Sequence, residues 1–264
     1  MVGGMPEVVQ TFVDTNDLSR CIELQNNIVH LYRSDIAKYA EKKDKIKIRD
    51  ILDQIPSQLD AKNNRFKLSE ISKNARYTYF ESSFLWPAKA GVALPCYNCM
   101  APILPLDLNR KRNLFKLYLC DTGLPCAMSI KNLQFDLLQG NLHINHGSIL
   151  ENVFAQELAS KNIDLTYYDQ KKLGELDFVV QDQNRIHIFE IKSGNDFQKH
   201  PALSKAIENK EWHLDDNYVF SKSNLFCAEK ITYLPFYMIM FFKIREQETL
   251  VGLNDLSMLF PPQS

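Results

Sequence analysis

The sequence lacks an apolar run long enough to cross a membrane. Its longest apolar stretch covers only residues 234–242, whereas a membrane-spanning helix needs about 20 apolar residues. The N-terminus also lacks the charged segment followed by an apolar segment that marks a secretory signal. We therefore expect a cytoplasmic protein that has no membrane partner.

Cysteine is sparse and is not spaced for a metal cluster. Of the six cysteines, only Cys96 and Cys99 show the two-residue gap of zinc and redox sites. A zinc site needs a second ligand pair, but Cys120 and Cys126 have a different gap and lie in an apolar segment. The sequence predicts reduced thiols, as is usual in the cytoplasm.

The sequence also lacks a glycine followed by lysine, so it contains no phosphate-binding P-loop and we expect no ATP hydrolysis by these residues. A net charge of -1 excludes bulk electrostatic coating of nucleic acid. Residues 38–76 nevertheless hold eleven Lys or Arg against six Asp or Glu, a surplus of five. A second basic group comprises Arg110, Lys111, Arg112 and Lys116. Such groups are equally typical of a solvated surface and of a phosphate-binding one.

The N-terminal part shows helical spacing of its apolar residues. The predicted helices cover residues 17–40, 46–55, 69–73 and 77–90. Asp17 has the position of an N-cap, Pro56 is expected to end the second helix, and Gly91 the last. Apolar pieces at 92–97 and 102–106 are expected to pair as a hairpin. Helices followed by a hairpin predict a winged-helix-like domain over residues 46–110, in which a basic helix could enter the major groove of duplex DNA. Winged helices also serve as protein-interaction modules.

Residues 114–119 have a strand pattern that ends at a turn. Gly123 is expected to supply a left-handed conformation there. Asp121 is interpreted as a turn-capping residue without a catalytic role.

From residue 148 onward the pattern predicts a regular α/β unit. Ser148 and Glu151 have the spacing of a capping box at the start of a helix that runs to about residue 160. The polar residues 182–184 mark a hairpin turn. The remaining predicted elements are strands 165–168, 175–181 and 185–192, a helix over 201–210, and strands 218–221 and 233–242.

Two acids and a lysine in this unit could carry chemistry. Strand alternation puts Glu190 and Lys192 on the same face. If the hairpin pairs positions that sum to 366 or 367, Asp177 faces Phe189 or Glu190. Converging carboxylates favour Mg²⁺ or Mn²⁺, which take oxygen ligands, and Lys192 could orient or deprotonate a water. A simple cross-strand ion pair explains the spacing equally well, but the apolar flanks and residues 174–177 favour a site.

These residues resemble the signature of the PD-(D/E)XK nuclease superfamily, an acid (Asp177) followed by Glu190-Ile191-Lys192 on the next strand. More closely, the chain resembles the C-terminal half of bacterial AAA-type ATP-binding proteins, in which a winged-helix-like region precedes a nuclease-like domain. The matching segments are residues 3–9 (GGMPEVV), 55–59 (IPSQL), 151–158 (ENVFAQEL), 175–178 (ELDF) and 190–194 (EIKSG).

The resemblance implies a restriction-endonuclease-like mixed α/β sheet flanked by helices, preceded by the helical winged-helix-like domain. It assigns Asp177 and Glu190 to a metal, Lys192 to catalysis, and Glu151 to the position of a third acid, where a capping role competes. It also implies that ATP and the ATPase domain, the expected partner, belong to a module outside this sequence. The expected divisions are a tail and linker at 1–45, the winged-helix-like domain at 46–110, a connection at 111–146, the nuclease-like domain at 147–245 and a tail at 246–264.

Two functions follow from the sequence. The first is a metal-dependent nuclease that cuts nucleic acid phosphodiester bonds, with duplex DNA as the expected partner. The alternative is a non-catalytic DNA- or protein-binding module of an AAA-type ATPase.

Overall fold

The computed structural model describes residues 1–264 except 62–64, 72–76, 130–145, 215 and 245–264. These residues form a mixed α/β structure with two mixed sheets. The predicted C-terminal tail at 246–264 lies outside the described residues. No described helix combines the length and apolar character needed to span a membrane.

Helices make up most of the N-terminal part, and those over 18–39, 45–59 and 77–89 match predicted helices, whereas the first and last were not predicted. They are α1 (Pro6–Thr15), α2 (Leu18–Tyr39), α3 (Lys45–Leu59), α4 (Tyr77–Lys89) and the short α5 (Gly123–Ser129), with a 3-10 turn η1 (Leu68–Glu70). The cap at Asp17 is confirmed, because its side chain accepts hydrogen bonds from the amides of Ser19 and Arg20. Pro56 does not end α3, so that prediction is wrong. The buried face of α3 continues to Leu59, and this packing holds the helix together past the proline.

The first sheet joins strands that are far apart in the sequence. Its order is β2 (Arg110–Leu119), β1 (Ala93–Cys99), β3 (Thr166–Gln170) and β4 (Gly174–Leu176). β1 pairs antiparallel with β2 and parallel with β3. The predicted hairpin between residues 92–97 and 102–106 is therefore wrong, because both edges of β1 are paired with other strands. Segment 102–106 instead leads into a 3-10 turn, η2 (Leu106–Asn109).

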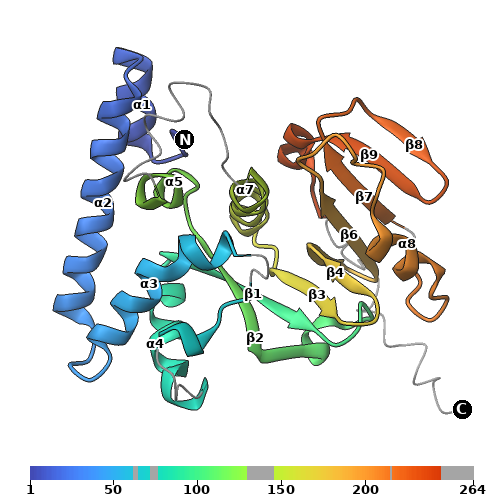
Figure 1. Ribbon diagram of the computed structural model, residues 1–264, viewed down its shortest axis with the longest axis horizontal. Coiled ribbons are helices and arrows are strands. Elements are labelled where there is room, and N and C mark those ends of the chain that lie inside the picture. The colour runs from blue at the N-terminus through green and yellow to red at the C-terminus, as the bar shows by residue number, and fades with distance from the viewer. Residues whose placement is uncertain (62–64, 72–76, 130–145, 215, 245–264) are drawn as a thin grey trace, which may run out of the picture.

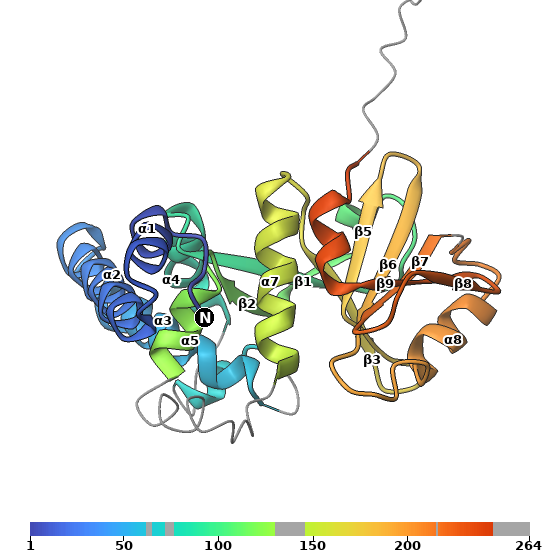
Figure 2. The ribbon, with the colours of Figure 1, turned by 90° about the horizontal axis from the view of Figure 1, so that it is seen from above.

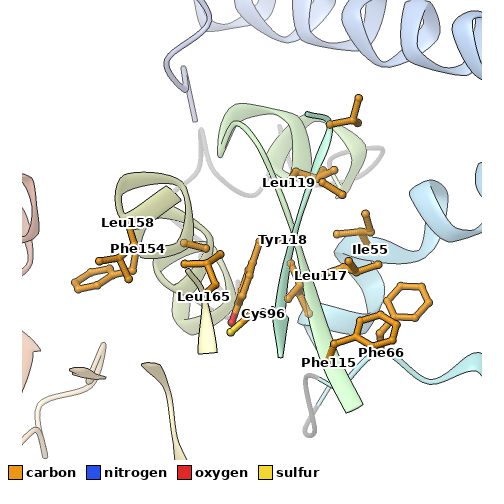
Figure 3. Close-up of a cluster of buried hydrophobic side chains, with 14 of the residues drawn as sticks. Ile55, Phe66, Cys96, Phe115, Leu117, Tyr118, Leu119, Phe154, Leu158 and Leu165 are labelled. Carbon is orange, nitrogen blue, oxygen red and sulfur yellow. The ribbon is translucent and has the colours of Figure 1, made fainter. Parts of the chain in front are cut away.

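Strand β2 has two buried faces that pack against different helices. Figure 3 shows Phe115, Leu117 and Leu119 on the side of α3, where Ile55 lies, and Tyr118 on the opposite side. That opposite side faces α7 (His146–Ser160). The strand predicted over residues 114–119 is thus confirmed, and the side chains of Lys116 and Tyr118 reach Glu151 of α7.

The second sheet has the order β5 (Phe178–Asp182), β6 (Arg185–Ile191), β7 (Asp216–Ser221), β9 (Ile231–Pro235) and β8 (Phe226–Ala228). The predicted sequence of helix, strands, helix and strand is present, with α8 (Pro201–Glu208) between β6 and β7. The strand predicted over 233–242 is shorter, because residues Phe236–Phe241 form the 3-10 turn η3. Helix α7 begins at His146, so Ser148 lies within the helix and the predicted capping box is wrong.

Helix α7 lies at the centre of the molecule. Figures 1 and 2 both place it between the N-terminal helices and the second sheet. Its Phe154 ring packs edge-on against Phe220 of β7, with 4.8 Å between the ring centroids, while Asn152 binds both the amide and the carbonyl of Leu119 at the end of β2. One helix therefore connects the two sheets.

Candidate functional site

The hairpin of β5 and β6 sets the register of the predicted site. Phe178 pairs with Phe189 and Asp182 with Arg185, so facing positions sum to 367, one of the two predicted registers. Carried one residue further, this register brings Asp177 opposite Glu190. Asp177 itself lies between β4 and β5, and thus the strand predicted over 175–181 is broken at this residue.

The break at Asp177 has a local cause. Its Oδ2 accepts a hydrogen bond from the backbone amide of Ile191 at 2.7 Å. A side-chain carboxylate thereby serves as the acceptor that a neighbouring strand carbonyl would normally supply to β6. This contact fixes the Asp177 carboxylate beside the end of β6, where Glu190 and Lys192 lie.

Glu190 and Lys192 form a close ion pair in this corner. Glu190 is only 3% exposed, and its Oε1 lies 2.5 Å from Lys192 Nζ. Its Oε2 is buried and has no hydrogen-bond partner among the described residues. Such an atom is costly unless a donor or a cation satisfies it.

Two further acids and a lysine border the pair. Lys116 Nζ of β2 lies 3.0 Å from Glu151 Oε2 of α7 and also contacts Glu175 Oε1 of β4. Tyr118, two residues along β2, donates a hydrogen bond to the same Glu151 oxygen at 2.8 Å. The Lys116 side chain is completely buried. Glu151, predicted as a possible third acid, is therefore already bound by two groups of β2.

The excess of carboxylates perturbs the protonation of the site. Burial raises the pKa of Asp177 well above its usual range, and the charges of Glu190 and Glu151 raise it further. Burial also raises the pKa of Glu190, although Lys192 opposes this shift. For Lys192, burial lowers the pKa, but Glu190 outweighs it and the net shift is upward. Lys192 is thus a cation and Asp177 is a carboxyl that favours its proton.

Asp177 and Glu190 could hold a hard cation together. Within the described ranges, no group of three or more His, Cys, Asp or Glu side chains is arranged to bind a metal. Mg²⁺ is commonly bound by one or two carboxylates with water or substrate oxygens as the other ligands. The unpartnered Glu190 Oε2 and the raised pKa of Asp177 fit such a two-carboxylate site.

Sequence reasoning missed Lys116, Tyr118 and Glu175. The sequence places Lys116 in a basic group that is typical of a solvated or a phosphate-binding surface, whereas Lys116 is a buried member of the site. A signal was present, because Leu114 and Tyr118 flank Lys116 on its own face while Phe115 and Leu117 lie on the other, a pattern that predicts a strand buried on both faces. A lysine within such a strand requires a carboxylate partner.

Much of the basic charge proposed for nucleic acid is paired with acids. Arg65 Nη2 lies 2.6 Å from Asp169 Oδ2, and Lys67 Nζ lies 3.8 Å from a Glu70 oxygen. Arg110 contacts both Asp107 and Asp164. Lys62, Lys73 and Arg76, also counted in the surplus, lie outside the described residues. The paired side chains offer less free charge than the sequence count indicated.

Cys96 and Cys99 do not face a common ligand. Both are buried on β1, where a separation of three residues puts them on opposite faces. Cys96 belongs to the larger core cluster and Cys99 to the smaller. Burial raises the pKa of Cys99 to about 12 and that of Cys96 as well.

The N-terminal segment binds Asp121, which lies between β2 and α5. The amide of Gly4 donates to Asp121 Oδ2 at 2.5 Å, and Gly123 donates to Oδ1 at 2.8 Å. Thr122 donates to Gln156 of α7. Asp121 therefore caps α5, in line with its predicted turn role. The left-handed conformation predicted for Gly123 is wrong, because positive φ angles occur at Gly3, Gly91 and Gly174 instead.

Comparison with known proteins identifies two regions of the chain. Residues 1–135, just over half of the 264, match the family described as Domain of unknown function (DUF8612). Residues 146–237 match Domain of unknown function (DUF4143). No curated protein and no solved structure matches the chain. Because the first match covers more than half of the sequence, the chain belongs to the DUF8612 family.

Proposed function

We propose that the chain is a metal-dependent nuclease-like protein that acts on nucleic acid phosphodiester bonds through Asp177, Glu190 and Lys192. The observation that carries this proposal is the buried Glu190 Oε2 beside Asp177, which has no hydrogen-bond partner in the part of the chain that the structure describes. Along the chain, the elements from residue 146 onward follow the order α7, β3, β4, β5, β6, α8 and β7. This order of helices and strands supports a restriction-endonuclease-like core. The DUF4143 match adds support, because this domain is commonly found in the C-terminal regions of AAA-type ATPases.

Each residue has a distinct role in the proposed reaction. Asp177 and Glu190 would hold Mg²⁺, which when bound polarises the phosphodiester and lowers the pKa of a water. Lys192 keeps its charge because Glu190 raises its pKa. It therefore acts by stabilising negative charge on the phosphate and by orienting a water, and is not the base. Lys192, Asp177 and Glu175 are each partly exposed, so a substrate can approach from their side.

The proposed parent is an AAA-type ATPase, with the ATP-binding module outside these residues. Duplex DNA is the proposed substrate, since a phosphodiester backbone complements a site that combines a hard cation with Lys192. The ion pairs of Arg65 and Arg110 limit the affinity of the surrounding surface. We therefore expect weak, salt-sensitive DNA binding.

A cleavage assay tests the proposal. A fluorescently labelled duplex DNA oligonucleotide is incubated with the full chain and Mg²⁺ or Mn²⁺, and with Glu190→Gln. Glu157→Gln is the matched control, because Glu157 lies on α7 and pairs with Lys161 outside the site. We expect cleavage by the wild type and the control and none by Glu190→Gln.

The competing function, a non-catalytic interaction module, has one observation in its favour. The 2.5 Å contact of Lys192 with Glu190 could be a purely structural ion pair. In that case the wild type binds no divalent metal, and Glu190→Gln changes stability without changing metal affinity. Metal binding without cleavage of DNA or RNA would instead assign the site to a metal-stabilised interaction module.

A further inference from the structure

A lysine from the DUF8612 region is enclosed by acids of the DUF4143 region. Lys116 is 0% exposed and contacts both Glu151 and Glu175 through Nζ. The same ammonium group lies 5.1 Å from the centroid of the Tyr167 ring. Burial of an unpaired ammonium costs several kcal/mol, so this arrangement depends on both carboxylates.

The charges of the cluster divide into two groups. Glu190 pairs with Lys192, and Glu151 and Glu175 pair with Lys116. Asp177 lies within electrostatic reach of both lysines. Counted over the described residues and fully ionised, the four carboxylates exceed the two ammonium groups by two negative charges. One divalent cation would balance this excess, whereas a second would leave an uncompensated positive charge in a buried region.

We propose that Lys116 occupies a cation position between Glu151 and Glu175, so that the site takes one divalent cation at Asp177 and Glu190 and no second one. This inference rests on the proposed metal-binding function. Lys116 and Tyr118 together use Glu151 as an acceptor, which withholds it from the metal. Lys116 is a positioning residue, since it acts through Glu151 and Glu175.

Both matched regions of the chain contribute residues to the proposed site. Lys116 and Tyr118 come from residues 1–135, and the four acids with Lys192 come from residues 146–237. Removal of the Lys116 charge would take the ammonium group away from Glu151 and Glu175. Two such carboxylates in one pocket attract a hard cation in its place.

The test is a Mn²⁺ titration of the full chain, followed by the electron paramagnetic resonance signal of free Mn²⁺. The variants are Lys116→Met and Lys116→Gln, of which Gln keeps a hydrogen-bond donor for Glu151 and disturbs the fold less. Lys161→Met is the control, because Lys161 directly follows α7 and pairs with Glu157 of that helix, outside the cluster. Thermal melts establish which variants are folded.

We expect one Mn²⁺ per wild-type and control chain. The Lys116 variants should bind a second Mn²⁺, or bind the single ion about tenfold more tightly, which corresponds to ~1.4 kcal/mol. One Mn²⁺ at wild-type affinity in a folded Lys116 variant would overturn the inference and leave the proposed function intact. No Mn²⁺ in any of these chains would refute the proposed function and, with it, the inference. A further outcome is that only the Lys116 variants bind Mn²⁺ and that adding Glu151→Gln abolishes this binding. This result would support a cation position occupied by Lys116 and would refute the metal site at Asp177 and Glu190.

Discussion

The Asp177 carboxylate and the backbone amide of Ile191 are joined by a 2.7 Å hydrogen bond. This contact requires an acceptor at position 177 but not a charge. The charge itself is unfavourable there, because burial and the nearby Glu190 raise the pKa of Asp177. A residue that weakens the metal-free fold in this way is typical of a functional site.

Asp177→Asn should therefore stabilise the metal-free protein. Asparagine keeps an oxygen that can accept from Ile191 and removes the carboxylate charge next to Glu190. At neutral pH in a chelator we expect the melting temperature to rise by roughly 2–4 °C, which is what about 1 kcal/mol gives in a chain of this size. Added Mn²⁺ should raise the melting temperature of the wild type only. A variant that melts lower than the wild type in chelator would contradict the electrostatic account of Asp177.

Lys192→Met should separate metal binding from catalysis. The substitution keeps much of the side-chain length but removes the charge that we assign to phosphate stabilisation. We expect Mn²⁺ to bind at least as tightly as to the wild type, because Glu190 loses a competing ammonium group, and cleavage to fall by about 100-fold or more. Lys199→Met is the control, since Lys199 pairs with Asp196 in an exposed position. Full cleavage activity in Lys192→Met would remove Lys192 from the mechanism.

Gly123→Ala should destabilise the fold by crowding. A Cβ at this position would lie 2.2 Å from Gln25 Nε2 and 2.9 Å from the Val2 carbonyl oxygen. Overpacking of this kind costs about 1–3 kcal/mol, and chemical denaturation measures the loss. Gly194→Ala is the matched control, because a Cβ there has no neighbour within 4 Å. Equal stability of the two variants would show that the N-terminal segment moves away at no cost.

His200 should make the protein sensitive to acid. Its Nε2 lies 2.7 Å from Tyr233 Oη, and burial, with a contribution from the charge of Lys192, lowers its pKa. A lowered pKa means that the unfolded chain binds the proton more tightly, so stability is lost as the pH falls below about 6.5. His200→Gln should lack this loss when unfolding free energies are compared between about pH 7.5 and pH 5.5. Parallel pH profiles for the two proteins would exclude His200 as the cause.

Local patterns predicted the elements that carry the proposed site. Strand alternation placed Glu190 and Lys192 on one face, and the polar turn at 182–184 allowed two registers, of which the structure has one. The broken strand at Asp177 was not predictable in this way. It depends on a side-chain acceptor replacing a backbone one, which residue spacing does not encode.

The contacts that the sequence did not predict are those between distant segments. The parallel pairing of β1 with β3 joins residues separated by about seventy positions and replaces the expected hairpin. Lys116 reaches Glu151 and Glu175 only because this pairing brings β2 close to α7. The sequence predicts that Gly123 is needed for a left-handed backbone conformation. In the structure a glycine is needed because a Cβ at this position would clash with Gln25.

The most direct test of the central claim is a crystal structure of the full chain grown with Mn²⁺, with anomalous diffraction used to locate the metal. The account predicts one anomalous peak, bounded by the carboxylates of Asp177 and Glu190, with Lys116 still bound to Glu151 and Glu175. The peak should vanish in Glu190→Gln crystals grown in the same way. An ordered site without a peak, or a peak coordinated by neither Asp177 nor Glu190, would contradict the account.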